Sequence, residues 1–138
     1  MIRLFDGSTH VMLYQRYRPE MPAVAVSAIM KFLEERSPPP HGICVDVGCG
    51  SGQSTPVFAL HFEKVVGYDV SDSQVEAARA TPDLPKNVSY EVAPAEVLPL
   101  PDKSVTLVTG CTSFHWFDLP KFYKVTPTFK IIFGLKVT

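Results

Sequence analysis

Three glycines at alternate positions, Gly48, Gly50 and Gly52, follow an apolar run that contains one acid, Asp46. A glycine-rich loop lets the backbone turn sharply and approach a ligand closely, and its N–H groups attract negative charge. A second acid, Asp69, ends the next apolar run. Its carboxylate is placed to accept hydrogen bonds from both hydroxyls of a ribose. This combination is typical of a site for an adenosine-containing cofactor.

The spacing of the loop narrows the choice of cofactor. A dinucleotide fingerprint, GxGxxG, needs glycine at position 53, where this chain has Gln53. The acid Asp46 would repel a pyrophosphate and attract an ammonium. S-adenosylmethionine carries an ammonium, which suits Asp46, and a carboxylate, which suits the loop N–H groups. The sequence therefore favours S-adenosylmethionine over a nicotinamide dinucleotide, although Asp46 could instead be a buried acid tied to backbone amides.

The elements that must position these residues alternate along the chain. Apolar runs and alternating patterns predict strands over 43–47, 65–68, 88–92, 105–109 and 131–137. Helical spacing, prolines and capping residues predict helices over 9–18, 22–36, 53–62, 71–79 and 118–124. Such alternation indicates an α/β fold, a Rossmann-like, mostly parallel sheet with flanking helices. The loop, Asp69, residues 94–98 and residues 109–116 should then converge at the carboxyl ends of the strands.

Composition fits one globular domain and excludes several classes of protein. The chain has 138 residues, 46% hydrophobic and 20% charged, with a formal net charge of −1. It has no basic block for nucleic acid, no apolar run that spans a membrane and no signal peptide. The three cysteines, Cys44, Cys49 and Cys111, form no CxxC pair, which favours free thiols in a reducing compartment. We therefore expect a cytoplasmic protein with no metal site and no membrane or nucleic-acid partner.

Several stretches of the chain, the glycine loop among them, are landmarks that occur in a fixed order. They are residues 14–19, 45–52, 67–71, 93–100, 104–109 and 113–118. With them the chain resembles class I S-adenosylmethionine-dependent methyltransferases over about residues 5–124. More specifically it resembles type 11 methyltransferases of the trans-aconitate methyltransferase-like branch. One GxGxG alone is a weak signal, but several landmarks in order are a strong one.

The resemblance implies a role for each matching position. The methionine part of the cofactor would lie among Asp46, Gly48, Cys49, Gly50, Gly52 and Thr109. The nucleoside would be held at the ribose by Asp69 and at the adenine by Ala95 and Glu96. Tyr17 and Arg18 would close over the cofactor, and His115 and Trp116 would line the acceptor pocket.

Several of these roles have a structural alternative. His115 is the candidate general base, but a histidine beside a tryptophan is often part of a packed pocket wall. Tyr17 either closes over the cofactor or packs on a helix face. Cys111 has no partner base in the sequence, so it is a small pocket or core residue rather than a nucleophile. Cys44 belongs to the core.

The pattern divides the chain into three segments. Residues 1–40 form an N-terminal helical cap, residues 41–124 the cofactor-binding core and residues 125–138 a divergent tail. Because the family pattern stops near Lys124, we expect a C-terminally truncated form with an incomplete sheet, in which 131–137 partly covers the edge of the fourth strand.

The expected activity is transfer of a methyl group from S-adenosylmethionine to a small-molecule acceptor, with a carboxylic acid as a candidate. Two alternatives stay open. One is a weak or inactive truncated isoform that binds cofactor or a protein partner. The other is a nicotinamide-dependent oxidoreductase, against which Gln53 and Asp46 both argue.

Overall fold

The fold comes from a computed structural model, which describes residues 21–101, 104–111 and 132–135. Some predicted features lie outside the described residues, namely the helices over 9–18 and 118–124 and the site residues Tyr17, Arg18, His115 and Trp116.

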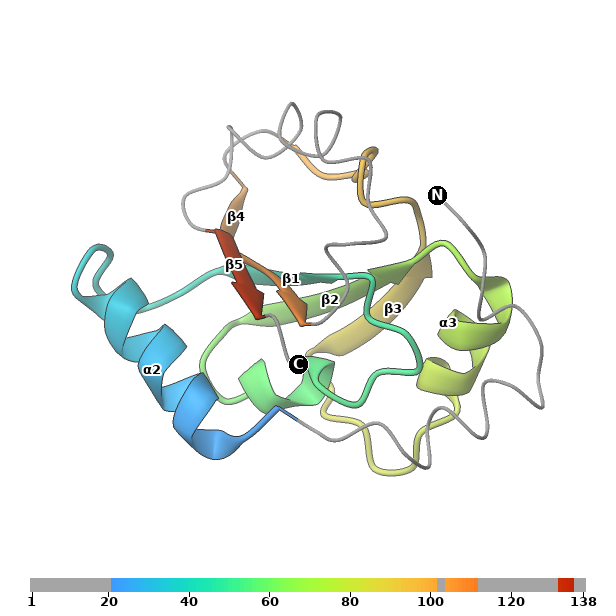
Figure 1. The fold of residues 1–138 in the computed structure, drawn as a ribbon, viewed down its shortest axis with the longest axis horizontal. Coiled ribbons are helices and arrows are strands. Elements are labelled where there is room, and N and C mark those ends of the chain that lie inside the picture. Colours follow the sequence, from blue (N-terminus) through green and yellow to red (C-terminus); the bar gives the residue numbers. More distant parts are fainter. Residues whose placement is uncertain (1–20, 102–103, 112–131, 136–138) are drawn as a thin grey trace.

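The described strands form one parallel sheet in the order β3-β2-β1-β4-β5 (Figure 1). Their bounds are β1 Ile43–Val47, β2 Lys64–Asp69, β3 Val88–Val92, β4 Val105–Cys111 and β5 Ile132–Leu135. The chain runs outward from β1 to β3 and then returns to β4 on the other side of β1. This reversal is the switch point where open α/β sheets bind ligands. The predicted fold class is confirmed, and β5 pairs along β4 as expected for residues 131–137.

The central strand β1 is buried on both faces. Cys44, Val45 and Val47 are fully buried and Asp46 is 3% exposed. Such a run is what a parallel strand covered on both faces requires. In the register of the sheet, Asp46 lies between Gly67 of β2 and Thr109 of β4. The acid singled out in the sequence thus lies at the centre of the sheet, one residue before β1 ends.

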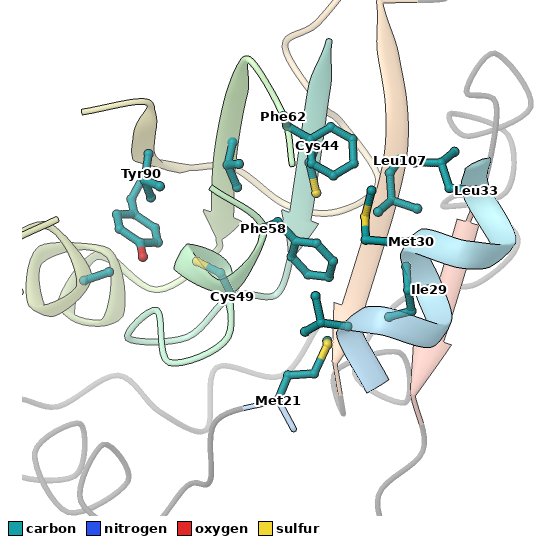
Figure 2. Close-up of a cluster of buried hydrophobic side chains, with 14 of the residues drawn as sticks. Met21, Ile29, Met30, Leu33, Cys44, Cys49, Phe58, Phe62, Tyr90 and Leu107 are labelled. Carbon is teal, nitrogen blue, oxygen red and sulfur yellow. The ribbon is translucent and has the colours of Figure 1, made fainter. Parts of the chain in front are cut away.

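Helix α2 (Ala23–Glu34) follows Pro22, which occupies its N-cap position. Its buried residues are the ones that the three- and four-residue spacing predicted, Val26, Ile29, Met30 and Leu33. They pack with Phe58, Leu107 and other side chains in one cluster of buried hydrophobic residues (Figure 2). Removing this apolar stripe from water is what holds the helix against the sheet.

The predicted helix over 53–62 is wrong in length. The structure has only a short 3-10 helix, η1 (Thr55–Phe58), with Pro56 in its first turn. Ser54 and Thr55 have low helix propensity because their side chains compete for hydrogen bonds. In addition, β2 begins at Lys64, so few residues remain to extend η1. The shortened element keeps Thr55 directly after the glycine loop.

Helix α3 (Asp72–Arg79) begins at the predicted cap residue. The Gln74 N–H donates to Ser71 Oγ at 3.3 Å. A full capping box would also have the Gln74 side chain accept from the Ser71 N–H. That N–H instead donates to Asp69 Oδ1 at 2.9 Å. The helix start is therefore tied to the acid at the end of β2.

Candidate functional site

The glycine loop joins β1 to η1 at the carboxyl end of the sheet. Gly48, Gly50 and Gly52 have φ angles of 64°, 59° and 87°, all in the left-handed region. The Cys49 N–H donates to the carbonyl of Tyr68 at 3.0 Å, which fixes the loop to the end of β2. Only glycine adopts a succession of such φ values at low cost. The alternate glycines thus serve the sharp turn that their spacing predicted.

Asp69 is the last residue of β2, and its carboxylate bridges two backbone segments. Its Oδ2 accepts from the Gly50 N–H and its Oδ1 from the Ser71 N–H, both at 2.9 Å. An ionised carboxylate offers about four acceptor positions, so two such bonds leave capacity for hydroxyl donors. The structure therefore brings Asp69 to the glycine loop, as the sequence predicted, and gives it a second task that the sequence did not reveal.

Asp46 is held by two threonine hydroxyls. Thr55 Oγ1 donates to Asp46 Oδ2 at 2.6 Å, and Thr109 Oγ1 lies 3.3 Å from Asp46 Oδ1. Hydrogen bonds to an ionised carboxylate favour its charged form, which burial alone would penalise. The alternative to a functional role was a buried Asp46 tied to backbone amides. The two bonds given above come instead from side chains on η1 and β4.

The surroundings of Asp46 affect a neighbouring thiol. Burial raises the pKa of Cys44 well above its ordinary value; the negative charge of Asp46 raises it further, and a hydrogen bond with Thr109 lowers it. The thiol is fully buried and stays protonated. Cys44 is thus a core residue, as predicted.

Tyr90 lies on β3, and its side chain packs against the glycine loop and against β2. A Cβ atom on Gly52 would lie 2.5 Å from the Tyr90 hydroxyl oxygen, and one on Gly67 would lie 2.6 Å from its ring. The hydroxyl lies 3.4 Å from the carbonyl oxygen of Gly52. Figure 2 shows Tyr90 and Cys49 at the end of the buried cluster that lies away from α2. The ring therefore fills the space that two glycines leave open.

Burial raises the pKa of Tyr90, and the nearby Cys49 raises it further, so the phenol stays neutral. Sequence reasoning placed Tyr90 in a strand but gave it no role at the site. The available signal was its position opposite Gly67, a pair that becomes visible only once the strand register is known.

The residues predicted beside the adenine follow β3. The Ala93 N–H donates to the carbonyl of Asp69 at 2.9 Å, which brings this segment to the end of β2. Ala95 is buried and Glu96 is half-buried in the turn that follows. Thr109 lies within β4, which continues to Cys111 rather than ending at Thr109 as predicted. All of these residues lie toward the carboxyl end of the sheet.

The loop region also contains buried polar atoms that could bond to a ligand. Within the described part of the chain, Gln53 Oε1 and Ser54 Oγ are buried and have no hydrogen-bond partner. Buried polar atoms in proteins are normally paired, so such atoms fit a ligand that carries donors. The two acids and these unpaired atoms form a polar set that fits the ammonium and hydroxyl donors of S-adenosylmethionine.

Two negative findings concern the described residues alone. No group of three or more histidine, cysteine or acidic side chains is placed to hold a metal ion among them. No helix in the same ranges is long and apolar enough to cross a membrane.

A family model described as a methyltransferase domain, the type 11 family, matches residues 45–125. The chain belongs to this methyltransferase family. The predicted resemblance to type 11 enzymes is thereby confirmed at the level of the family, and so is S-adenosylmethionine as the cofactor that the family uses.

Three comparisons agree with this assignment. A Dictyostelium discoideum protein named as a methyltransferase is 37% identical over 111 residues, which cover 80% of this chain and 39% of that protein. CRG1 of Saccharomyces cerevisiae, named as an S-adenosylmethionine-dependent methyltransferase, is 30% identical and matches 80% of this chain and 38% of its own length. A solved methyltransferase structure from Anaeromyxobacter dehalogenans has a TM-score of 0.62 at 37% identity, covering 78% of this chain and 42% of that one. The chain thus spans about two fifths of each of these relatives.

Proposed function

We propose that this chain binds S-adenosylmethionine at the carboxyl ends of β1, β2 and β3 and supports methyl transfer to a small-molecule acceptor. The observation that carries the proposal is the joint placement of the glycine loop, Asp46 and Asp69 at the switch point of the sheet. The yeast relative named as dependent on S-adenosylmethionine supports the same cofactor.

Each of the following candidate site residues has a task in this proposal. The glycine loop, whose Cys49, Gly50 and Gly52 N–H groups donate within the protein, lets the backbone approach the amino-acid end of the cofactor closely. Asp46 attracts its ammonium, and Asp69 accepts from the ribose hydroxyls. Ala95 and Glu96 border the adenine. Tyr17 and Arg18, assigned by resemblance, would close the site.

When bound, S-adenosylmethionine supplies an already activated methyl group for in-line displacement. The chain then has to position the acceptor and exclude water. A carboxylate acceptor, the class suggested by the trans-aconitate methyltransferase-like branch, needs no general base. A hydroxyl or amine acceptor would need one, and His115 is the candidate.

The direct test is calorimetry of the 138-residue chain with S-adenosylhomocysteine and, separately, with NAD. Binding of S-adenosylhomocysteine alone supports the proposal. Binding of NAD alone would favour the oxidoreductase reading instead. Binding of neither would favour an inactive chain whose role is contact with a protein partner.

Replacing Asp69 identifies its part in binding. We expect Asp69→Ala to weaken S-adenosylhomocysteine binding by about 1–3 kcal/mol, because the ribose donors lose their acceptor. The variant should also melt earlier, since Gly50 and Ser71 lose their bonds to the carboxylate. Glu63→Ala, which removes an exposed acid at the other end of β2, is the matched control. An unchanged dissociation constant for Asp69→Ala would remove Asp69 from the site.

A further inference from the structure

We infer that Thr55 is a positioning residue, which orients the Asp46 carboxylate toward the amino-acid end of the cofactor. This inference rests on the proposed function and adds to it a residue that lies outside the glycine motif. Thr55 is fully buried and begins η1, directly after the loop.

The bond between Thr55 and Asp46 is the shorter of the two to this carboxylate. Its 2.6 Å length is typical of a hydroxyl donating to a charged oxygen, whereas Thr109 lies at 3.3 Å. The Thr109 hydroxyl also lies 3.4 Å from the carbonyl oxygen of Val45, so its one proton is shared between two acceptors. Thr55 is therefore the stronger of these two donors.

The two threonines approach different oxygens from different elements. Thr55 reaches Oδ2 from η1, and Thr109 reaches Oδ1 from β4. A carboxylate held at both oxygens cannot rotate freely about its terminal bond. The plane of the group, and with it the direction of its charge, is thus set before a ligand arrives, which lowers the cost of binding.

A purely structural role for Thr55 would affect binding differently. The Thr55 side chain also lies beside the Tyr90 hydroxyl, which supports Gly52. If Thr55 mattered only for the shape of the loop, its loss would weaken every adenosine ligand alike. If it acts through Asp46, its loss should weaken only ligands that carry the amino-acid end.

A pair of ligands separates these two roles. S-adenosylhomocysteine has the ammonium and carboxylate, and 5′-methylthioadenosine lacks both but keeps the nucleoside and the thioether. Thr55→Val conserves the shape of the side chain and removes the hydroxyl, whereas Thr55→Ser keeps the hydroxyl. Binding is measured by ligand-observed NMR competition, which reads weak affinities, with thermal melting of each apo variant.

We expect Thr55→Val to weaken S-adenosylhomocysteine about tenfold, because the Asp46 carboxylate is no longer held in its binding orientation, and to change 5′-methylthioadenosine less than about twofold. Thr55→Ser should restore most of the loss. Asp46→Asn should show the same ligand selectivity. Because the two residues act as one unit, the double variant should bind S-adenosylhomocysteine no more weakly than Asp46→Asn alone.

Other results would overturn the inference. Equal weakening of both ligands would make Thr55 a structural residue, and no weakening of either would remove its role. If Thr55→Val does not fold, the same comparison with Thr55→Ala decides. If the unsubstituted chain binds neither ligand, the proposed function itself fails. This outcome differs from one in which the unsubstituted chain binds both ligands and Thr55→Val weakens both equally, which overturns only the role of Thr55.

Discussion

Asp46 lies at the carboxyl end of β1, and His41 lies two residues before its amino end. Both side chains are buried, with 3% and 5% of their surface exposed. The Asp46 carboxylate accepts hydrogen bonds from two threonine hydroxyls. Within the described residues, neither ring nitrogen of His41 has a hydrogen-bond partner, and its ring lies 5.5 Å from that of Phe62. Two buried polar residues near the opposite ends of one strand thus have opposite surroundings.

The difference shows where the fold provides polar partners. A buried carboxylate is tolerated only when hydrogen bonds replace water, and two elements converge on Asp46 to supply them. His41 is packed as an apolar side chain would be, against an aromatic ring. Burial of a polar residue therefore does not by itself mark a site in this protein, but donors brought from separate elements do.

The largest effect on stability is expected at Gly67, which lies toward the carboxyl end of the sheet. A Cβ on Gly67, beside Asp46 in the sheet, would lie 2.6 Å from the Tyr90 ring and 3.0 Å from the Cys49 sulfur. Tyr90 is 2% exposed and has little room to move. Gly67→Ala should therefore lower the free energy of unfolding by about 1–3 kcal/mol, measured by urea denaturation.

Gly42, at the amino end, is the matched control. The nearest atom to a Cβ there is Thr106 Oγ1 at 3.8 Å, an ordinary contact. Gly42→Ala should change stability little. A smaller side chain at position 90, Tyr90→Leu, should recover part of the loss in Gly67→Ala. Equal losses for the two alanine variants would show that the carboxyl end is packed no more tightly than the amino end.

Sequence reasoning located the elements of this site better than the contacts within it. Continuous apolar sequence and simple alternation predicted β1 and β3 with the bounds that the structure shows. The turn at the glycine loop and the cap at Ser71 follow from local chemistry that a few neighbouring residues decide. Such features depend on little else in the fold, which is why one sequence was enough to predict them.

The bonds of Thr55 to Asp46 and the packing of Tyr90 on Gly67 were not predictable in this way. Tyr90 and Gly67 meet only when β3 pairs with β2. The bond of Thr55 to Asp46 spans nine residues and depends on the path that the glycine loop takes from β1 to η1. The predicted helix over 53–62 was too long because Ser54 and Thr55 are weak helix formers and β2 begins soon afterwards, at Lys64. The contacts of these side chains, unlike most of the elements that carry them, therefore depend on the three-dimensional path of the chain.

Alkaline pH should lower the free energy of unfolding through Tyr68, near the carboxyl end of β2, and the expected effect is smaller. Burial, and then the charge of Glu91, raise the pKa of Tyr68 from 10.0 to about 12. Between these values the folded chain keeps a proton that the unfolded chain has lost, so stability should fall as pH rises from 10 to 12. Tyr68→Phe should flatten this fall, and Glu91→Gln should flatten it partly. Urea denaturation across this pH range measures both, and parallel curves for all three chains would contradict the assignment.

The smallest expected effect is at His41. An apolar side chain of similar volume would remove two unpaired nitrogens from the interior and keep the packing on Phe62. His41→Leu should therefore leave the free energy of unfolding unchanged or raise it by about 1 kcal/mol, measured by urea denaturation. His61→Leu, at an exposed position, is the control for a general effect of losing a histidine. A clear loss of stability confined to His41→Leu would mean that its nitrogens do have partners, and the contrast between the two ends of β1 would then disappear.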